Sequence, residues 1–519
     1  MIRLLTLIIA AVVLFGCNCP FDNLFSEKKA EACPQVKATD KKDIKKCPKA
    51  NAKVCPKAKD CKTAKCTMVK DCKTKACPKA AAKKAVVAPK AAAKKAVVAP
   101  KAAAKKAVVA PKAAAKKAVV APKAKFAQNS KTGVYKVGEP IIFNFALTPA
   151  ENKVCKNRKV TFSCYGDPSF KSQTITLDKD GKATITYTAK KPGYYRVYSY
   201  VYKVGAGAIV SPYEIKAARP VPKDFNSYWD NLTKVLDKTP LKPTLTPTKS
   251  PIKNALAYDL QLPCPISKAG VSGYFTRPVK AAPKSLPAIL YVHGAGVYSA
   301  SASTMGIKAL TLNINAHGIK NGQPKSFYNN LYKTTLKNYW HIGIDNRDTA
   351  YFRDMALRVY RALQFLKAQP EWNQKVLIVS GGSQGGAQAL MGAGLDRQVS
   401  AAVVHVPAVC DHGGSTIGRE SGWPRCSSTP LYKKAPKKCA EALDYVDCVN
   451  FASRIKTAKI YMTTGTIDTT CVPSSVCAAF NAIPSKDKKL DIVLNMPHRI
   501  DPSLGAKAYK FITNEFNKK

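Results

Sequence analysis

Acidic residues are scarce in this sequence. Only 32 aspartates and glutamates stand against 85 lysines and arginines, which gives a formal net charge of +53 at pH 7. A charge of this size argues against an ordinary cytosolic enzyme and favours anionic partners: acidic polysaccharide, a lipid or lipopolysaccharide surface, or nucleic acid. Part of the excess is local, because residues 24–125 contain 30 lysines and 6 acidic residues. Composition alone does not choose among these partners.

Histidine is scarce as well, and all six histidines lie at or beyond His293. The cysteines between Cys17 and Cys77 therefore have no imidazole near them, and their spacing is irregular and surrounded by lysine. Structural zinc sites use regularly spaced cysteine and histidine ligands, so we expect no metal in this region. The later cysteines could form disulfides in an exported protein, with Cys155 and Cys164 as one candidate pair. Four more crowd one later segment: Cys410, Cys426, Cys439 and Cys448.

A long apolar run is missing even at the N-terminus, which reads "MIRLLTLIIAAVVLFGC". One cation, Arg3, precedes an apolar run that ends at Phe15 and is too short for a comfortable membrane span. This pattern predicts a secretory signal peptide over residues 1–16. Leu14 to Cys17 resembles the bacterial lipoprotein box, in which the cysteine is lipidated; plain cleavage and release is the alternative. We expect a protein of the bacterial cell envelope, anchored by lipid, or a secreted one.

Residues 17–124 form a low-complexity segment. The unit "KAAAKKAVVAP" occurs four times without variation between Lys79 and Pro122. A proline every 11 residues breaks a helix, and the few sizeable apolar side chains cannot offset chain entropy. The segment is therefore interpreted as a lysine-rich tether that holds the rest of the chain at a membrane or an anionic polysaccharide. Similar repeats occur in linker-histone tails, but nucleic acid is the less favoured partner.

Residues 125–217 alternate apolar and polar positions, as in "YKVGEPIIFNFAL" and "SQTITLDKDGKATITYTA". Turn signals such as Asp180-Gly181 separate the alternating runs. Short antiparallel strands of this kind predict an immunoglobulin-like β-sandwich. Two roles stay open for it, carbohydrate binding and simple spacing, and spacing is favoured.

Residues 218–519 alternate apolar strands with helices, from "LPAILYVHGAG" to "LDIVLNMPH". This alternation predicts an α/β fold with a mainly parallel sheet covered by helices. Within it, Gly381, Ser383 and Gly385 satisfy G-x-S-x-G between the strand "VLIVS" and the helical "AQALMGAGL". In this strand-to-helix elbow the serine is a candidate nucleophile, exposed above the sheet near a helix N-terminus.

A nucleophilic serine needs a base, and the base needs an acid to orient it. In hydrolases of this order both partners follow the serine, which leaves three histidines. His405 lies inside an apolar strand. His412 starts a polar segment and cannot be the last member of the triad if an acid must precede it by a strand. His498 closes "LDIVLNMPH", which we expect to be the final strand, and is the predicted base. Asp468, just past the strand "AKIYMTTG", is the predicted acid, with Asp411 as its competitor.

The oxyanion hole is expected from two backbone N–H groups, those of Ala295 and Gln384. Ala295 follows the strand that ends in "LYVHGAG", and Gln384 follows the nucleophile. His293 in the same motif is interpreted as a structural hydrogen-bonding residue.

These motifs resemble the acetyl xylan esterase and cephalosporin C deacetylase family, carbohydrate esterase family seven. The matching stretches are "PVPKDFNSYW", "HGAG", "GIDNRDTAYFRDMALRVYRALQFL", "GGSQGG", "TGTIDTTCVPSSVCAAFN" and "NMPH". The resemblance covers about residues 220–519 and implies an α/β-hydrolase fold. It also implies Ser383, Asp468 and His498 as the triad, Ala295 and Gln384 as the oxyanion hole, and a homo-oligomer, often a ring. Two departures are "HGA" for the family's "HGY" and Pro497 before the terminal histidine.

The sequence thus predicts an exported serine esterase that removes acetyl groups from acetylated poly- or oligosaccharides through an acetyl-enzyme, with no metal or organic cofactor. Two other readings stay open. One is a tethered binding lipoprotein with a vestigial hydrolase domain, and the other is a different α/β-hydrolase, a peptidase or a lipase. The excess of basic over acidic residues favours an acidic glycan as substrate, such as glucuronoxylan or a sulfated polysaccharide.

Overall fold

The computed structural model describes residues 123–154, 157–302, 305 and 308–517. The predicted signal peptide, Cys17 and the lysine-rich repeats lie outside these residues, as does Cys155 of the candidate pair with Cys164. The cysteines of the described residues are all buried free thiols. No helix in these described ranges combines the length and the apolar character needed to cross a membrane.

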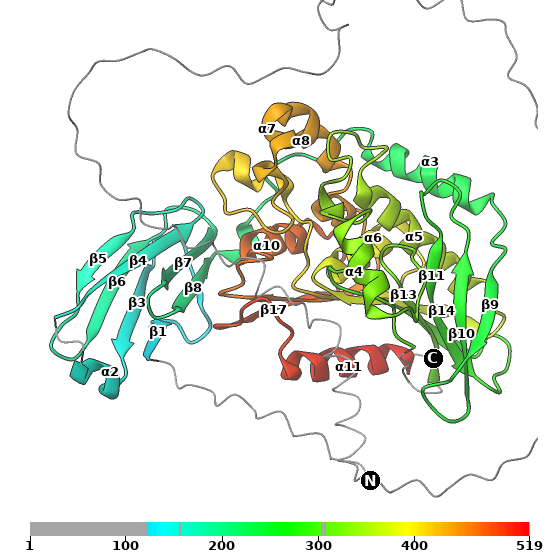
Figure 1. The fold of residues 1–519 in the computed structure, drawn as a ribbon, viewed down its shortest axis with the longest axis horizontal. Helices are drawn as coiled ribbons and strands as arrows, with labels where there is room; N and C mark the ends of the chain where they lie inside the picture. Colours follow the sequence, from blue (N-terminus) through cyan, green and yellow to red (C-terminus); the bar gives the residue numbers. More distant parts are fainter. Residues whose placement is uncertain (1–122, 155–156, 303–304, 306–307, 518–519) are drawn as a thin grey trace, which may run out of the picture. The chain divides into compact units, whose positions relative to one another are not determined.

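The first described strands build a β-sandwich, drawn in cyan and blue-green in Figure 1. One sheet has the order β1-β3-β6 and the other the order β2-β8-β7-β4-β5. The elements are β1 (Ala124–Gln128), β2 (Val134–Tyr135), β3 (Pro140–Leu147), α2 (Pro149–Val154), β4 (Lys159–Gly166), β5 (Gln173–Thr176), β6 (Lys182–Thr188), β7 (Gly193–Ser199) and β8 (Val204–Val210).

Alternation along the strands sets the core of the sandwich. In β3, Ile141, Phe143 and Phe145 are buried while Asn144 between them is exposed, as a period of two requires. Phe145 packs edge-on against Phe162 of β4, with ring centroids 5.1 Å apart. Aromatic side chains that face inward from both sheets thus hold the two layers together.

A short helical turn, η3 (Pro212–Glu214), leads from the sandwich into a nine-stranded sheet with the order β17-β16-β15-β14-β12-β13-β11-β10-β9. Pairing is parallel from β17 to β13 and antiparallel from β13 to β9. The strands are β9 (Thr244–Thr248), β10 (Ala255–Leu262), β11 (Val271–Pro278), β12 (Leu286–Val292), β13 (Leu310–Ile314), β14 (Trp372–Gly382), β15 (Ala401–His405), β16 (Lys459–Gly465) and β17 (Lys488–Val493).

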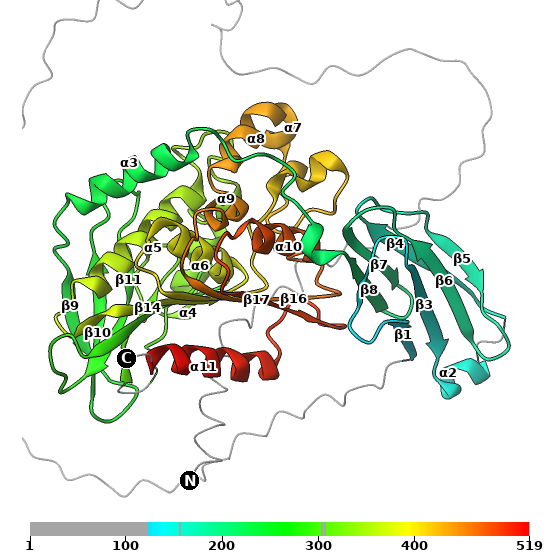
Figure 2. The ribbon, with the colours of Figure 1, turned by 180° about the vertical axis from the view of Figure 1, so that it is seen from behind.

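Helices cover both faces of this sheet, so the fold is the predicted α/β one, with a mainly parallel sheet (Figures 1 and 2). They are α3 (Phe225–Asp237), α4 (Lys325–Lys333), α5 (Tyr351–Lys367), α6 (Gln384–Leu395), α7 (Pro430–Lys434), α8 (Pro436–Asp444), α9 (Cys448–Ala452), α10 (Pro473–Ala482) and α11 (Pro502–Phe516). Short 3-10 turns are η5 (Tyr339–His341), η6 (His412–Ile417) and η7 (Cys426–Ser428).

Two-sided burial explains why the parallel strands read as continuous apolar runs. On β12, Ala288 and Leu290 face the large core beneath α5 and α6, whereas Ile289 between them packs in a smaller core with Ile512 of α11. Figure 2 shows α11, in red, on the opposite side of the sheet from α5 and α6. The sheet therefore separates two hydrophobic layers.

The loops that carry the predicted site residues follow the carboxyl ends of parallel strands. β12 ends before His293, β14 before Ser383 and β16 before Thr466. Parallel strands present these ends along one edge, where ligands bind in open α/β sheets. The fold thus gathers three loops that are far apart in the sequence.

One expectation about this edge is wrong. The last strand, β17, ends at Val493, so His498 does not close a strand. Asn495 has a left-handed φ of 54°, which stops the extended backbone, and its N–H donates to Oγ1 of Thr466 at 2.8 Å. The backbone oxygen of Met496 lies 2.1 Å from where a Cβ on Gly465 would stand. The histidine therefore sits in a loop that packs against the loop after β16.

Candidate active site

The turn between β14 and α6 holds Ser383 in a strained conformation. Its φ of 58° and ψ of −122° are rarely adopted by a residue with a side chain. The turn needs glycines around it because the backbone oxygen of Val292 lies 2.4 Å from a Cβ placed on Gly385 and 2.7 Å from one on Gly381. The backbone of β12 thus approaches this turn so closely that only glycine fits on either side of the strained serine.

Backbone hydrogen bonds fix this turn on both sides. The N–H of Ser383 donates to the carbonyl oxygen of His405 at 2.9 Å. The carbonyl oxygen of Ser383 accepts from Ala408 at 3.0 Å and from Ala387 at 3.1 Å. Since α6 begins at Gln384, the positive end of the helix dipole lies next to the serine.

The structure brings the three predicted triad side chains together. Nε2 of His498 lies 2.9 Å from the Ser383 hydroxyl and Nδ1 lies 2.8 Å from Oδ2 of Asp468; when the ring is neutral with its proton on Nδ1, Nδ1–H donates to Asp468 and Nε2 accepts from Ser383. Asp468 is fully buried, while the His498 side chain is 22% exposed. A base with its proton acceptor aimed at the serine and its other nitrogen held by a carboxylate has the geometry of an activated nucleophile.

Asp468 is held by its own loop. Its second oxygen, Oδ1, accepts the N–H groups of Thr470 at 2.8 Å and Cys471 at 2.9 Å. These bonds fix the carboxylate so that Oδ2 is left for His498. The motif "DTTC" thus positions the acid through its backbone.

The charge state of His498 follows from these neighbours. Burial of the ring lowers the pKa of His498, whereas the Cys471 and Asp468 side chains raise it, and the net direction is well above 6.5. Burial also raises the pKa of the Cys471 thiol, which is therefore neutral, so the Asp468 carboxylate supplies the charge that favours a protonated imidazole.

The competing acid and the other late histidines lie elsewhere. Asp411 forms an ion pair with Arg419 at 2.7 Å and accepts the N–H of Ala218 at 2.8 Å. His405 is buried and His412 is partly buried, and desolvation of the rings lowers the pKa of each to about 4. His405 meets the serine only through its backbone, and neither ring is hydrogen-bonded to Ser383 or Asp468 in any contact of the described residues.

The loop after β12, which carries Ala295, is held by His293. The Nε2 atom of His293 accepts the N–H of Ala316 at 3.0 Å, so the ring proton is on Nδ1 and is donated to the oxygen of Gly294 at 2.7 Å. Gln388 of α6 donates to the oxygen of His293 at 3.0 Å. His293 therefore ties the loop to the strand beside it, and Gln388 ties it to the nucleophile's helix.

A second histidine, His317, completes this support. Its Nε2–H donates to the oxygen of Gly296 at 2.9 Å, and its Nδ1 accepts from the Tyr351 hydroxyl at 2.6 Å. The Tyr339 hydroxyl accepts the N–H of Gly296 at 3.3 Å and donates to Oε1 of Gln384 at 2.5 Å. The carbonyls on both sides of Ala295 are thus fixed by neutral imidazoles.

Burial keeps these two rings uncharged. It lowers the pKa of His293 to about 4, and burial together with the nearby His293 lowers that of His317 to about 3. Sequence reasoning identified His293 as a structural residue but missed His317, Tyr339 and Gln388. The only signal was a second His-Gly pair after the next strand, "NINAHG".

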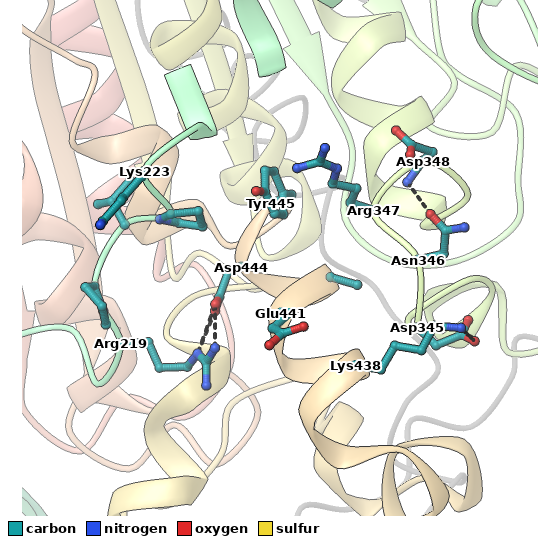
Figure 3. Close-up of a pocket in the computed structure, with 14 residues that line it drawn as sticks. Arg219, Lys223, Asp345, Asn346, Arg347, Asp348, Lys438, Glu441, Asp444 and Tyr445 are labelled. Atoms are coloured by element: carbon teal, nitrogen blue, oxygen red, sulfur yellow. Dashed lines mark hydrogen bonds and ion pairs between the residues drawn. The ribbon is translucent and has the colours of Figure 1, made fainter. Parts of the chain in front are cut away.

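A separate hollow of about 620 Å³ lies between the segment before α3, the loop at residues 345–348 and α8 (Figure 3). Opposite charges pair within it: Arg219 with Asp444 at 2.8 Å and Lys438 with Asp345 at 3.3 Å. None of the triad residues lines it. Hydrogen-bond geometry, rather than the size of this hollow, marks the candidate active site.

Comparisons with known proteins agree on one family. The family model described as acetyl xylan esterase (AXE1) matches residues 211–515. The acetyl esterase Axe7A of Xylanibacter ruminicola is 30% identical over 346 residues, which cover 63% of this chain and 76% of that protein.

Two solved structures are similar over the same part of the chain. An acetyl xylan esterase from Paenibacillus sp. R4 has a TM-score of 0.49 and 24% identity, covering 58% of this chain and 98% of its own. Acetyl xylan esterase 1 from Thermoanaerobacterium sp. JW/SL YS485 has a TM-score of 0.48 and 20% identity, with 59% and 98% covered. Similarities of this size carry no conclusion about function.

Proposed function

The chain belongs to the acetyl xylan esterase family and is a carboxylic ester hydrolase, and from this premise we propose that it removes O-acetyl groups from acetylated polysaccharides through an acetyl-enzyme on Ser383. The single observation that carries the proposal is the hydrogen-bonded chain from Ser383 through His498 to Asp468, set in a strained turn at a helix N-terminus.

In the first step the Ser383 oxygen attacks the acetyl carbonyl carbon while Nε2 of His498 takes the hydroxyl proton. The tetrahedral oxyanion is stabilised by the backbone N–H groups of Ala295 and Gln384. Asp468 stabilises the imidazolium that forms. The bond to the sugar oxygen then breaks, that oxygen takes the proton from His498, and the acetyl group stays on the serine.

In the second step water attacks the acetyl-enzyme and gives its proton to the same nitrogen of His498. Collapse of the second tetrahedral intermediate releases acetic acid and returns Ser383 to its hydroxyl form. No step requires a metal or an organic cofactor. The buried Asp468 stays a carboxylate throughout, so each cycle restores all charges.

Two other readings have less support. A binding protein with a vestigial hydrolase domain would not need three side chains held at hydrogen-bond distance. A peptidase or a lipase would share the triad, but the family match favours an esterase for acetyl groups.

Export, lipidation of Cys17 and attachment through residues 17–124 are also part of the proposal, and they are supported by the sequence alone. Its net charge of +53 favours an acidic acetylated glycan and an anionic envelope surface over a neutral one. If binding to acidic and to neutral acetylated glycans had the same salt dependence, this preference would be wrong. A homo-oligomer is expected from the family resemblance.

The proposed activity is tested by measuring acetate released from O-acetylated polysaccharides, beside hydrolysis of p-nitrophenyl esters of increasing acyl length. We expect acetate release and a preference for the acetyl ester, with both lost in Ser383→Ala. Ser380→Ala, three residues earlier on β14, is the matched control and should keep both activities. Unchanged turnover in Ser383→Ala, or a preference for long acyl chains or peptides, would contradict the proposal.

A further inference from the structure

Three tyrosines form an aromatic cluster on the outer side of the sandwich, which we call the tyrosine platform: Tyr165 of β4, Tyr198 of β7 and Tyr200 just after β7. The Tyr198 and Tyr200 rings meet edge-to-face with centroids 4.9 Å apart, and the hydroxyls of Tyr165 and Tyr200 are 2.6 Å apart. Tyr200 is 62% exposed. Large aromatic side chains held together in contact with water mark a binding surface rather than a core.

A buried cation fixes the platform from below. The Arg196 guanidinium lies 4.2 Å from the ring centroid of Tyr165 and 5.9 Å from that of Tyr198, and its side chain is only 8% exposed. On β8, opposite Tyr198, a Cβ at Gly205 would stand 2.7 Å from Cδ2 of the ring. The glycine therefore lets the Tyr198 ring lie over the neighbouring strand, and the rings are oriented before any ligand arrives.

The platform lies on a face that continues into the hydrolase domain. Arg196 reaches Oε1 of Glu420 at 3.5 Å, and the Glu420 N–H donates to Oδ1 of Asp167 at 2.9 Å. Two residues before Arg196 on the same face, Tyr194 is fully buried in the large core of the hydrolase domain. A Cβ on Gly207, opposite Arg196, would stand 1.6 Å from the backbone oxygen of Thr466. The sandwich is thus anchored beside the loop that carries the catalytic acid.

The segment that starts at Glu420 leads directly to that acid. The Arg425 guanidinium donates to the oxygen of Thr469 at 2.6 Å, and the Trp423 N–H donates to the oxygen of Thr470 at 2.6 Å. Thr470 in turn donates its N–H to Asp468. A continuous series of direct contacts therefore connects the platform to the triad.

The chemistry of the platform fits a saccharide chain. A pyranose ring has apolar C–H faces and a rim of hydroxyls, and a tyrosine offers an apolar ring face with a polar hydroxyl tip. Residues 123–217 contain 16 lysines and arginines against 6 acidic residues, so the whole module also attracts a chain that carries carboxylates.

We propose that the tyrosine platform binds sugar units of the same polysaccharide chain whose acetyl group lies at Ser383. This inference rests on the proposed function and assigns the sandwich a substrate-binding role, the less favoured of its two predicted roles. A polymer long enough to reach both sites gains affinity from the second contact, whereas a small ester such as p-nitrophenyl acetate does not.

The platform is tested with Tyr200→Ala and a matched control, Tyr213→Ala. Tyr213 is 63% exposed, packs near Phe480 and lies outside the platform. On acetylated xylan, Tyr200→Ala should raise KM about three- to tenfold, the loss expected for one aromatic contact, while Tyr213→Ala leaves it unchanged. Both variants should hydrolyse p-nitrophenyl acetate like the wild type, and Tyr200→Phe, which keeps the ring, should retain most of the polymer affinity.

These measurements distinguish a failure of the platform proposal from a failure of the proposed esterase function. Equal KM values for Tyr200→Ala and Tyr213→Ala on the polymer would overturn the platform, as would an equal loss on both substrates by Tyr200→Ala. If the wild type releases no acetate from any polysaccharide, the proposed function fails instead. Retention of Ser383→Ala by xylan in affinity electrophoresis, measured with and without Tyr200→Ala, then still decides whether the platform binds the glycan.

Discussion

The two sides of Ser383 use the same residue type in opposite electrostatic states. On one side His498 is paired with the buried carboxylate of Asp468, and its pKa is raised well above 6.5. On the other side His293 and His317 have no carboxylate partner in the contacts described above, and burial lowers their pKa to about 4 and 3. We therefore propose that His498 on one side moves protons, while His293 and His317 on the other hold backbone groups in place.

This difference follows from the second hydrogen bond that each ring makes. A carboxylate on Nδ1 stabilises the imidazolium, so His498 can accept a proton during the reaction. Carbonyl and hydroxyl partners in a buried site stabilise only the neutral ring, which fixes its tautomer. The surroundings, and not the residue type, thus decide which of these histidines is suited to act as a base.

The largest effect on kcat is expected from a change to Asp468, the carboxylate partner of His498. Asp468→Asn should lower kcat for p-nitrophenyl acetate by about 10³- to 10⁴-fold, because the amide removes the charge that stabilises the imidazolium and disturbs its tautomer. Asp411→Asn is the matched control: Asp411 pairs with Arg419, so this variant should lose thermal stability but keep its turnover. A similar kcat for Asp468→Asn and the wild type would remove Asp468 from the triad.

A smaller effect on kcat is expected from changes next to the loop after β12, which carries Ala295. His317→Phe removes the donor to Gly296 and should lower kcat about 10- to 100-fold with little change in KM, because a misplaced Ala295 N–H stabilises the oxyanion less. His317→Gln, which can still donate to that carbonyl, should recover part of the loss. His412→Phe removes another imidazole whose pKa is lowered by desolvation, in η6 and outside this loop, and should affect stability alone. Equal kcat values in the two Phe variants would show that His317 has no positioning role.

The smallest expected difference between His498 and His317 lies in the pH dependence of kcat/KM. His498 must be neutral to accept the serine proton, so kcat/KM should rise about tenfold per pH unit until the pH passes a pKa above 6.5 and then level off. Asp468→Asn should move this midpoint to lower pH, because the charge that raises the pKa of His498 is gone. His317→Gln should leave the midpoint in place. A second step between pH 5 and 7 in the wild-type profile that is absent from the profile of His317→Gln would contradict the neutral state assigned to His317.

Much of the site could be predicted from the sequence because it depends on local order. The glycines around Ser383, the position of Asp468 after a strand and the late histidine follow from chain order alone. The prediction that the last strand runs to His498 was wrong. Asn495 adopts a left-handed backbone conformation, for which the sequence has no strong signal, and the strand ends at Val493.

The supporting network could not be predicted in the same way. Tyr339, Gln388 and His317 come from three separate segments and meet only after the sheet and α6 have packed. The platform was hidden for the same reason: alternation predicts that Tyr198 lies on a sheet face, but not that the face continues toward the triad. Contacts between distant segments depend on packing, which residue patterns describe poorly.

The central claim is that Ser383 carries the acetyl group during turnover. It is tested most directly by peptide mass spectrometry after acid quenching of the protein during hydrolysis of p-nitrophenyl acetate. We expect one acetyl group on the peptide that contains Ser383 and none on any peptide of Ser383→Ala. An acetyl group on a different residue, or continued turnover without acetylation of Ser383, would contradict the account.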